Sequence, residues 1–592
     1  MKNIDSFFMP IHFTSSISID QPGIHLQFLY NPKWEELQSH LTSLSSKIPN
    51  SYRYQLPQKN NAKSHENWSA SCSLQSHLFY LPHSILCLAY YPIRRTRCQK
   101  NMPSLFEQWS NAVTHFFSLV PNRDVPMYVH IPRVEGEDEI RDGLWNGAME
   151  ASGYQDEKGM KEFWKSIECF IVSDEFEVKK KQKVAVSPPP KKRVIRVIKK
   201  RGGGGGSASK KDAIAKYMIA GQIALVRKEV QYLVDLTSNI KTTEFLKNHY
   251  KNGMKNGWYF PDLCAKSKKM SKLLESYRRG SYRIHILNKE KLKKEKLNLI
   301  LSVNAGSKMK PYLMMIEYDT LGKGKGKRKI HPKRLKKLRE SMKTCMMVGK
   351  GVIFDSGGMD LKPGGPNLIE MKNDMTGSAI VYGFTKLLQY MPPSVDQRVV
   401  TMIPLVENRM DGASTHSGNK IETRHGMDVM VMNTDAEGRL IMGDAFSYGV
   451  ELYKPNMVMD VATLTGAAHS FSSGKFSIAS VRNIPTMTSE YQKWIQQLKD
   501  RKEDILTIPF RDEFLGYMRG TKGEALSVRY DMRANFLQAS GFLGNFLPDS
   551  TPWFHLDLSQ SSYGNYGSNQ GHSSMTGIYA CVYGWKNWMQ HV

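Results

Sequence analysis

The sequence predicts an α/β protein in which an N-terminal α/β domain is joined by a basic linker to a C-terminal three-layer α/β/α domain with a mixed central sheet. The first observation is the length of 592 residues, which exceeds what one hydrophobic core usually supports. The second is a hydrophobic fraction of 40% and a charged fraction of 23%, both ordinary for folded chains. The third is the alternation of strand-length apolar runs with helical or polar stretches. We expect domains at 1–177 and 212–592, with the linker at 178–211.

The N-terminal region has the pattern of a small α/β domain. Short apolar runs such as SILCLAYYPI and VPMYVHIP alternate with polar helical stretches such as SLFEQWSNAVTHFFSLV. No motif in this region carries chemistry.

The linker is the clearest domain boundary. KKKQKVAVSPPPKKRVIRVIKKRGGGGGSASKK combines three prolines, five consecutive glycines and unbroken positive charge, and this composition cannot form a packed core. A second basic run extends from Lys323 to Lys343. The two runs contribute to a formal net charge of +28, which attracts acidic partners. A solvated linker is the preferred interpretation, and nuclear import or nucleic-acid binding is the alternative.

The second half of the chain has the pattern of a larger α/β domain. DAIAKYMIAGQIALVRKEVQYLVDL predicts an amphipathic helix, and YRIHILN, LNLILSVNAG and YLMMIEYD are expected strands. The sheet is expected to continue through CMMVGKGVIF, RVVTMIPLVE, MVMDVATLTG and PWFHLDLS.

A glycine-rich segment places charged residues after one of these strands. VGKGVIFDSGGMDLKPGGPNLIEMKND carries Lys350, Asp355, Lys362 and Asp374. In open α/β sheets, ligands bind just beyond the carboxyl ends of the strands. The segment is therefore a candidate functional loop.

A second acidic segment, VMNTDAEGRLIMGDAF, contains Asp435, Glu437 and Arg439. If this segment is extended, these alternate residues project to the same side and can converge. A single Asp before Gly is usually a turn-former, but a cluster of carboxylates without compensation would repel itself and normally implies bound cations. Carboxylates alone suit magnesium or manganese, whereas a nitrogen from a neutral lysine shifts the preference toward zinc, cobalt or manganese.

The two segments together resemble the signatures of the leucyl aminopeptidase (M17) family, VGKGxxFDSGG and NTDAEGR. The resemblance continues through DVATLTGA from Asp460 and through His555-Leu-Asp557, and it covers about 211 to 592. It implies a metal-dependent aminopeptidase with two divalent metals per subunit. Zinc is one candidate, and manganese, cobalt or magnesium could occupy the exchangeable site.

The resemblance also implies a role for each matching residue. The tightly bound metal would be held by Lys350, Asp355, Asp374 and Glu437, and the exchangeable metal by Asp355, Asp435 and Glu437. Lys362 would polarise the scissile carbonyl, and Arg439 would anchor a bicarbonate that acts as general base. Substrate contacts would come from Met371, Thr463, Leu464 and Gly466.

The implied chemistry is the release of an N-terminal residue, leucine-like and hydrophobic, from peptides. Paired metals can bridge a water and lower its pKa, while the free amine of the peptide occupies one metal. An internal peptide bond offers no such amine. As a metal ligand, Lys350 must be neutral, so neighbouring cations must bring its pKa well below the usual value of about 10.4.

Several segments depart from the family pattern. KPGGPNLIEMKND, from Lys362 to Asp374, is one residue longer than expected, so Asp374 is assigned from the local DMTG match. TRHGMDVMVM and VRYDMRANFLQASG replace family segments near the site, which leaves the substrate preference open. The basic insertion LGKGKGKRKIHPKRLKKLRESMK is longer than the usual connection. The resemblance implies a homo-hexamer, and self-repulsion of this insertion could weaken it.

Two other functions compete with the peptidase hypothesis. One is a catalytically weak or inactive scaffold with the aminopeptidase fold, since fold and function separate easily, and such a scaffold could bind nucleic acid through its basic segments. The other is a two-metal phosphoesterase, which has no evident use for a lysine ligand beside the arginine of NTDAEGR.

Cysteine usage and hydropathy bear on the compartment. The seven cysteines are scattered with no CxxC pair, which fits a reducing compartment. No stretch reaches the ~18 apolar residues that a membrane span needs. We therefore expect a cytoplasmic protein without a membrane partner, and organellar or nuclear addresses stay open.

Overall fold

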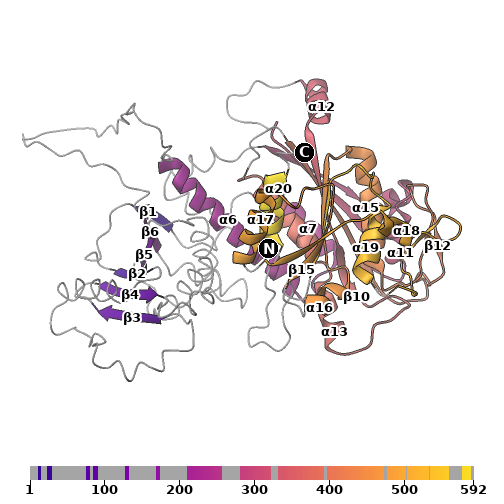
Figure 1. Cartoon of the computed structure of the whole chain (residues 1–592), viewed down its shortest axis with the longest axis horizontal. Coiled ribbons are helices and arrows are strands. Elements are labelled where there is room, and N and C mark those ends of the chain that lie inside the picture. Colours follow the sequence, from indigo (N-terminus) through magenta and orange to yellow (C-terminus); the bar gives the residue numbers. More distant parts are fainter. Residues whose placement is uncertain are drawn as a thin grey trace, which may run out of the picture. The chain divides into compact units, whose positions relative to one another are not determined.

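A computed structural model gives the fold of this chain (Figure 1). It describes residues 11–14, 23–29, 75–80, 84–90, 127–131, 169–173, 210–256, 280–321, 331–391, 397–472, 476–501, 503–532, 534–558 and 577–588. The chain divides into two compact units, one of Met1–Gly221 with Phe260–Ser271 and the other of Gln222–Tyr259 with Lys272–Val592.

The first unit contains a six-stranded sheet in the order β1-β6-β5-β2-β4-β3. Its strands are β1 (Ile11–Thr14), β2 (Gly23–Leu29), β3 (Gln75–Tyr80), β4 (Ser84–Tyr90), β5 (Met127–Ile131) and β6 (Cys169–Ser173). Neighbours pair in parallel except β3 and β4, which are antiparallel. The runs SILCLAYYPI and VPMYVHIP supply β4 and β5 as predicted. The expected helix SLFEQWSNAVTHFFSLV and most of the linker at 178–211 lie outside the described residues.

The second unit is built on a nine-stranded sheet in the order β16-β15-β18-β14-β9-β11-β8-β7, with β10 pairing to β11. These strands are β7 (Ser281–Leu287), β8 (Tyr312–Asp319), β9 (Lys343–Gly349), β10 (Gly351–Asp355), β11 (Gln397–Asn408), β14 (Met457–Ala462), β15 (Ser477–Arg482), β16 (Ile505–Pro509) and β18 (Trp553–Asp557). β11 is parallel to β9 and antiparallel to β8, so the sheet is mixed as predicted.

Helices cover both faces of this sheet. The described helices are α6 (Lys210–Asp235), α7 (Thr243–Asn256), α10 (Lys289–Lys294), α11 (Asn298–Val303), α12 (Pro332–Glu340), α13 (Pro366–Glu370), α14 (Thr376–Leu387), α15 (Glu437–Tyr453), α16 (Gly466–Ser472), α17 (Ser489–Asp500), α18 (Glu513–Tyr517), α19 (Asn535–Gly544) and α20 (Ile578–Trp588). A 3-10 helix, η6 (Met371–Asn373), precedes α14, and β12 (Lys420–Ile421), β13 (Val429–Met430) and β17 (Ala525–Leu526) form a small separate sheet.

Alternation along β9 shows that α14 and α15 lie on opposite faces. Met346 and Val348 belong to the hydrophobic cluster that contains Phe446 of α15. Gly349 instead faces α14, because a Cβ there would meet Val381 at 2.5 Å. Odd and even residues of a strand point to opposite faces, so the unit has the predicted three layers.

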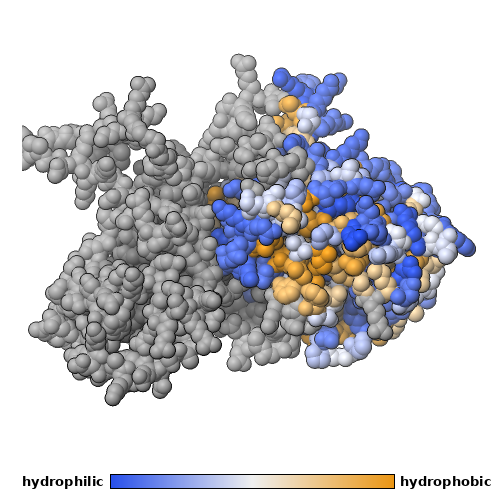
Figure 2. Space-filling view, viewed as in Figure 1, coloured by the Kyte–Doolittle hydropathy of each residue, from blue (hydrophilic) through white to orange (hydrophobic). Residues whose placement is uncertain are grey.

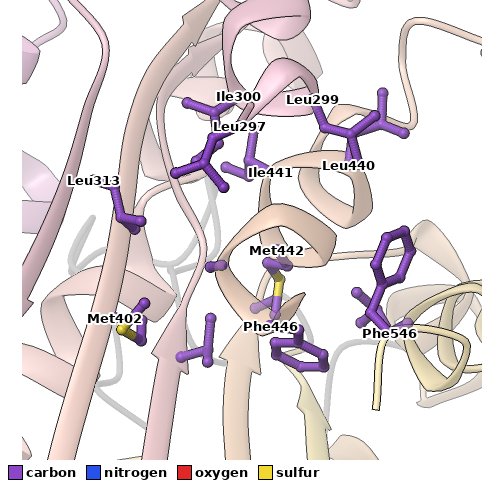
Figure 3. Packing of buried hydrophobic residues seen from close by; sticks show 14 of the residues in the cluster. Leu297, Leu299, Ile300, Leu313, Met402, Leu440, Ile441, Met442, Phe446 and Phe546 are labelled. Atoms are coloured by element: carbon purple, nitrogen blue, oxygen red, sulfur yellow. The ribbon is translucent and has the colours of Figure 1, made fainter. Parts of the chain in front are cut away.

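The predicted strand LNLILSVNAG is wrong, because this segment forms helix α11. Leu299, Ile300 and Val303 are buried at helical spacing, and they pack against the α15 side of the core (Figure 3). The backbone N–H of Ile300 donates to Asp444 Oδ2 at 2.9 Å, so it has a side-chain partner instead of a neighbouring strand. An apolar run this short does not distinguish a buried strand from a buried helix.

The described part of the basic insertion forms α12, which lies at the top of the view (Figure 1). Its side chains form a largely hydrophilic surface (Figure 2). Lys333, Arg334, Lys336 and Lys337 are exposed. Arg339 connects the helix to strand β8 of the sheet, because its Nε donates a hydrogen bond to Asp319 Oδ2 at 2.7 Å. Within the described residues, no helix combines the length and apolar character that crossing a membrane requires.

Candidate active site

Three carboxylates from the two acidic segments meet at one end of the large sheet. Asp355 is the last residue of β10, Glu437 is the first residue of α15, and Asp435 lies in the turn before it. One oxygen from each of the three lies within 4.8 Å of the others. A group of this kind can hold a metal ion.

Asp435 and Glu437 come together, but not through the extended backbone that the sequence predicted. The acidic segment is not extended: the chain turns at Thr434 and Asp435 and enters α15 at Glu437. Asp435 N–H donates to Asn433 Oδ1 at 2.7 Å, which stabilises the turn. The expected alternation is therefore wrong, and Arg439 already belongs to the first turn of the helix.

Lys350 stands between β9 and β10 and reaches into the carboxylate cluster. Its side chain is only 3% exposed, and Nζ lies 2.7 Å from Asp374 Oδ1 and 2.8 Å from Glu437 Oε1. Nζ also donates to the carbonyl oxygen of Thr463 at 2.8 Å. A Cβ at Gly438 would lie 2.8 Å from this Nζ and 2.5 Å from Cε. The glycine after Glu437 is therefore required by the lysine side chain that lies over it.

The backbone of Lys350 is fixed by a neighbouring strand and by a helix on one face of the sheet. Its N–H donates to the carbonyl of Val461 at 3.1 Å, and its carbonyl accepts from the N–H of Ser378 at 2.8 Å. These bonds connect the residue to β14 and to α14. Lys350 is thus held in place by β14 and α14.

Lys362 reaches the same cluster from the glycine-rich loop. Its Nζ lies 2.8 Å from Asp355 Oδ2 and also contacts Asp435 Oδ1. The loop turns back at Gly357 and Gly358, whose φ angles of +92° and +66° favour glycine. Asp355 is held by Asn408, whose Nδ2 donates to Oδ1 at 2.8 Å. Asn408 was not singled out in the sequence, because it ends strand β11 without a recognisable motif.

Asp374 completes the cluster. It follows η6, is buried, and accepts from Thr463 Oγ1 at 2.7 Å. Among the described residues, Asp374 Oδ2 and Glu437 Oε2 are buried carboxylate oxygens without a hydrogen-bond partner. Buried carboxylate oxygens are costly without a donor or a cation. The donor set therefore fits divalent metal ions.

The protonation of the cluster reflects burial and crowding. Burial, together with Asp355 and Glu437, raises the pKa of Asp435 to about 7. Burial opposes ionisation of Glu437, but Lys350 and Lys362 outweigh it and lower the pKa of Glu437 to about 2. Burial lowers the pKa of Lys350, yet Asp374, Glu437 and Asp355 outweigh burial and raise it. The carboxylates alone favour the ammonium form, so a neutral Lys350 requires the charge of bound cations.

Arg439 is buried in the first turn of α15, two residues after Glu437. Its Nη1 donates to the carbonyl of Ser527 at 2.7 Å, and its Nε has no hydrogen-bond partner among the described residues. Burial lowers the pKa of Arg439 to about 10, which leaves the guanidinium charged at neutral pH. A buried, partly unpaired guanidinium is suited to an anion.

The four expected substrate residues lie on two segments beside the cluster. Met371 begins η6, three residues before Asp374. Thr463 and Leu464 follow β14, and Gly466 begins α16. Thr463 contacts both Lys350 and Asp374, and the carbonyl of Met371 accepts from the N–H of Asp374 at 3.3 Å.

Residues 252–582 match the catalytic domain of the cytosol aminopeptidase family. The chain belongs to this family. The predicted resemblance to M17 leucyl aminopeptidases is therefore confirmed.

Relatives in this family share about a third of the aligned residues. A probable cytosol aminopeptidase of Desulfotalea psychrophila is 34% identical over 312 residues, which cover 52% of this chain and 55% of that protein. One of Cenarchaeum symbiosum is 32% identical over 282 residues, covering 47% and 52%. The chain thus spans about half the length of the curated relatives it matches.

Solved structures of the same fold are more distant in sequence. The bottromycin maturation enzyme BotP in complex with Mn superposes with a TM-score of 0.65 at 15% identity, covering 96% of this chain and 100% of that one. A tomato leucine aminopeptidase mutant gives 0.64 at 17% identity, covering 98% and 96%. These likenesses establish the fold alone.

The sequence did not reveal the role of Asp557. This residue was noted only as part of the match His555-Leu-Asp557. In the structure it is fully buried at the end of β18, and it accepts hydrogen bonds from Leu464 and Thr465 beside the cluster. Its position after an apolar strand was the available signal.

Proposed function

We propose that this chain is a two-metal aminopeptidase that hydrolyses the N-terminal residue, leucine-like and hydrophobic, from peptides. The observation that carries the proposal is the group of Asp355, Asp435 and Glu437, whose oxygens lie within 4.8 Å of one another with two lysines among them. Such a concentration of carboxylates, two of them buried, is stable where divalent cations bind.

The residues that would hold these metals follow the family pattern. Lys350, Asp355, Asp374 and Glu437 would form one site, and Asp355, Asp435 and Glu437 the other. The nitrogen in the first site favours zinc, manganese or cobalt, and the all-carboxylate second site also suits magnesium. When bound, the pair would supply Lewis acidity and a water of lowered pKa.

Other residues would act on the substrate directly. Lys362, one-fifth exposed, would donate a hydrogen bond to the carbonyl oxygen of the scissile bond, where negative charge develops. The buried guanidinium of Arg439 would hold bicarbonate as the general base. Met371, Thr463, Leu464 and Gly466 would contact the peptide, with Met371 lining the pocket for the first side chain.

The organisation of the whole protein is part of the same proposal. We retain an N-terminal domain at 1–177, a basic linker at 178–211 and the catalytic domain at 212–592. Assembly into a homo-hexamer and a cytoplasmic location belong to the proposal, as the family resemblance implies. Size-exclusion chromatography with light scattering would test the assembly, and fractionation of the source cells would test the location.

The decisive experiment is metal-dependent release of the first residue from a peptide that begins with leucine. The protein would be stripped with chelator and zinc, manganese, cobalt or magnesium restored separately. We expect activity to return with metal, to be absent with the N-acetylated peptide, and to be lost in Asp435→Ala. Asp549→Ala is the matched control, because this side chain is 85% exposed.

One outcome would replace the proposal. If the wild-type protein binds two metals but releases no N-terminal residue from a broad peptide panel, it is an inactive scaffold with this fold. Salt-dependent binding of nucleic acid would then be the next measurement.

A further inference from the structure

Asp557 connects two neighbouring strands to the segment beside the carboxylate cluster. It is the last residue of β18 and is fully buried, opposite Ala462 of β14 in the parallel register. Leu558 N–H donates to the carbonyl of Ala462 at 2.8 Å, which fixes the two strand ends together. The carboxylate of Asp557 is therefore held at a fixed distance from the chain that leaves β14.

Its carboxylate accepts three hydrogen bonds from that chain. The N–H groups of Leu464 and Thr465 donate to Oδ1 at 2.9 and 3.2 Å, and Thr465 Oγ1 donates to Oδ2 at 2.6 Å. Hydrogen bonds to an ionised acceptor are stronger than neutral ones. Burial nevertheless raises the pKa of Asp557, and His555 together with these donors offsets only part of the rise.

Thr463, the residue just before Leu464, bonds to the cluster. The Thr463 carbonyl accepts from Lys350 Nζ at 2.8 Å, and the Thr463 hydroxyl donates to Asp374 Oδ1 at 2.7 Å. Thr463 and Leu464 are also two of the residues that we place against the peptide. A displacement of the turn would therefore move substrate contacts and the support of two metal ligands at once.

We infer that Asp557 is a positioning residue that fixes the turn Thr463–Gly466 in the conformation the reaction needs. It acts through the turn: in the part of the chain that the structure describes, its hydrogen bonds go to Leu464 and Thr465, and none goes to Lys350 or Asp374. Removing the carboxylate would leave two backbone donors without an acceptor in a buried place, so the turn would rearrange to satisfy them. The catalytic consequence rests on the proposed function, but the structural consequence does not.

The first arm of the test measures hydrogen–deuterium exchange of the backbone amides of Leu464 and Thr465, without substrate. We expect these amides to exchange about tenfold faster or more in Asp557→Ala, because they lose their acceptor. Asp557→Asn keeps one acceptor oxygen and should fall between Asp557→Ala and wild type. Thr465→Val removes only the hydroxyl bond and should be the mildest.

Asp444→Asn is the matched control. Asp444 is also a fully buried aspartate that accepts from a backbone N–H, that of Ile300 at 2.9 Å, but it supports α11 in the core. We expect Asp444→Asn to lower stability without changing the exchange of Leu464 and Thr465. Asp557→Asn is compared with it directly, and Thr465→Val keeps the test available if Asp557→Ala does not fold.

The second arm measures kcat and KM for the leucine-headed peptide in the metal-loaded enzyme. We expect kcat/KM to fall about 10- to 100-fold in Asp557→Ala, the range typical of residues that orient a metal site from its outer shell. The loss should appear mainly in KM, because the turn contacts the bound substrate. Metal stoichiometry, measured by elemental analysis, should remain at two.

The results distinguish the inferred role of Asp557 from the proposed peptidase function. Unchanged exchange at Leu464 and Thr465 in both Asp557 variants overturns the inference, whatever the activity. A fall in kcat/KM that Asp444→Asn reproduces equally also overturns it, because a general loss of stability then explains the effect. If the wild-type protein has no peptidase activity, the proposed function fails while the exchange arm still decides the role of Asp557.

Discussion

Two buried charge clusters lie in the larger unit, and they differ in how their charges are balanced. In the first, Glu229 is surrounded by Lys386 at 3.1 Å, His249 at 2.9 Å and the hydroxyl of Tyr382 at 2.9 Å. In the second, four carboxyl groups (Asp355, Asp374, Asp435 and Glu437) face the two ammonium groups of Lys350 and Lys362, an excess of two negative charges when all four are ionised.

The difference separates a structural cluster from a functional one. Glu229 has partners for both oxygens and needs nothing from outside the chain. The second cluster leaves Asp374 Oδ2 and Glu437 Oε2 without a hydrogen-bond partner among the described residues. A charge excess of this kind indicates where a cation binds.

Glu229→Gln should give the largest effect on stability. It leaves the ammonium of Lys386 buried without its negative partner, and breaking a buried ion pair in this way costs about 3–5 kcal/mol. Urea unfolding of the metal-loaded protein would measure the loss. Metal stoichiometry should not change. Loss of metal in this variant, or wild-type stability, would contradict the distinction between the clusters.

Lys362→Ala, unlike Glu229→Gln, should affect catalysis more than stability. We expect kcat to fall about 10²- to 10³-fold, the range for removing one preorganised donor to a developing negative charge. The free energy of unfolding should change little. Lys296→Ala, at an exposed pair with Glu422, is the matched control and should keep full activity. Equal kcat values in the two variants would refute the role of Lys362.

A pH titration of stability should expose the Glu229 cluster. Burial raises the pKa of Glu229, but Lys386 and His249 outweigh it and lower the pKa to about 2, below the usual 4.5. A carboxyl group with a lowered pKa stabilises the fold fully above its unfolded pKa and loses that contribution as pH falls toward its folded pKa. Urea midpoints should therefore fall between pH 4.5 and 2, and less steeply in Glu229→Gln. Equal slopes in the wild-type protein and in Glu229→Gln would show that Glu229 does not cause the loss of stability in acid.

The smallest effect is expected at the surface. Lys336 and Glu340 of α12 lie 3.9 Å apart with side chains 80% and 59% exposed. Such pairs contribute about 0.5 kcal/mol or less, so Lys336→Ala should unfold at nearly the wild-type urea midpoint. A loss above about 1 kcal/mol would show that α12 supports the fold more than its exposure indicates.

The sequence predicted the fold and the cluster where local pattern and structure agree. The apolar runs of β9, β11, β14 and β18 are buried central strands, so continuous hydrophobicity identified them. Asp355 and Asp374 were predicted from loops that follow such runs, and the structure places both near Lys350. Their roles as ligands remain proposals.

The features that the sequence did not predict depend on contacts between segments that are far apart in the chain. Helix α11 has the same apolar composition as a strand, and its packing against α15 determines its conformation. Asp557 accepts a hydrogen bond from Leu464, which is distant in sequence but follows the neighbouring strand, β14. No local pattern contains such a pairing. The turn at Asp435 was missed because an acidic, glycine-containing segment fits both extended and turning backbones.

Gly438 gives the two signature segments a common physical basis. The side chain of Lys350 rests where a Cβ of residue 438 would stand, at 2.5 Å from its Cε. An alanine there and the lysine could not keep their positions together. The lysine of VGKG therefore requires the glycine of NTDAEGR. An engineered replacement of either segment has to preserve both residues together.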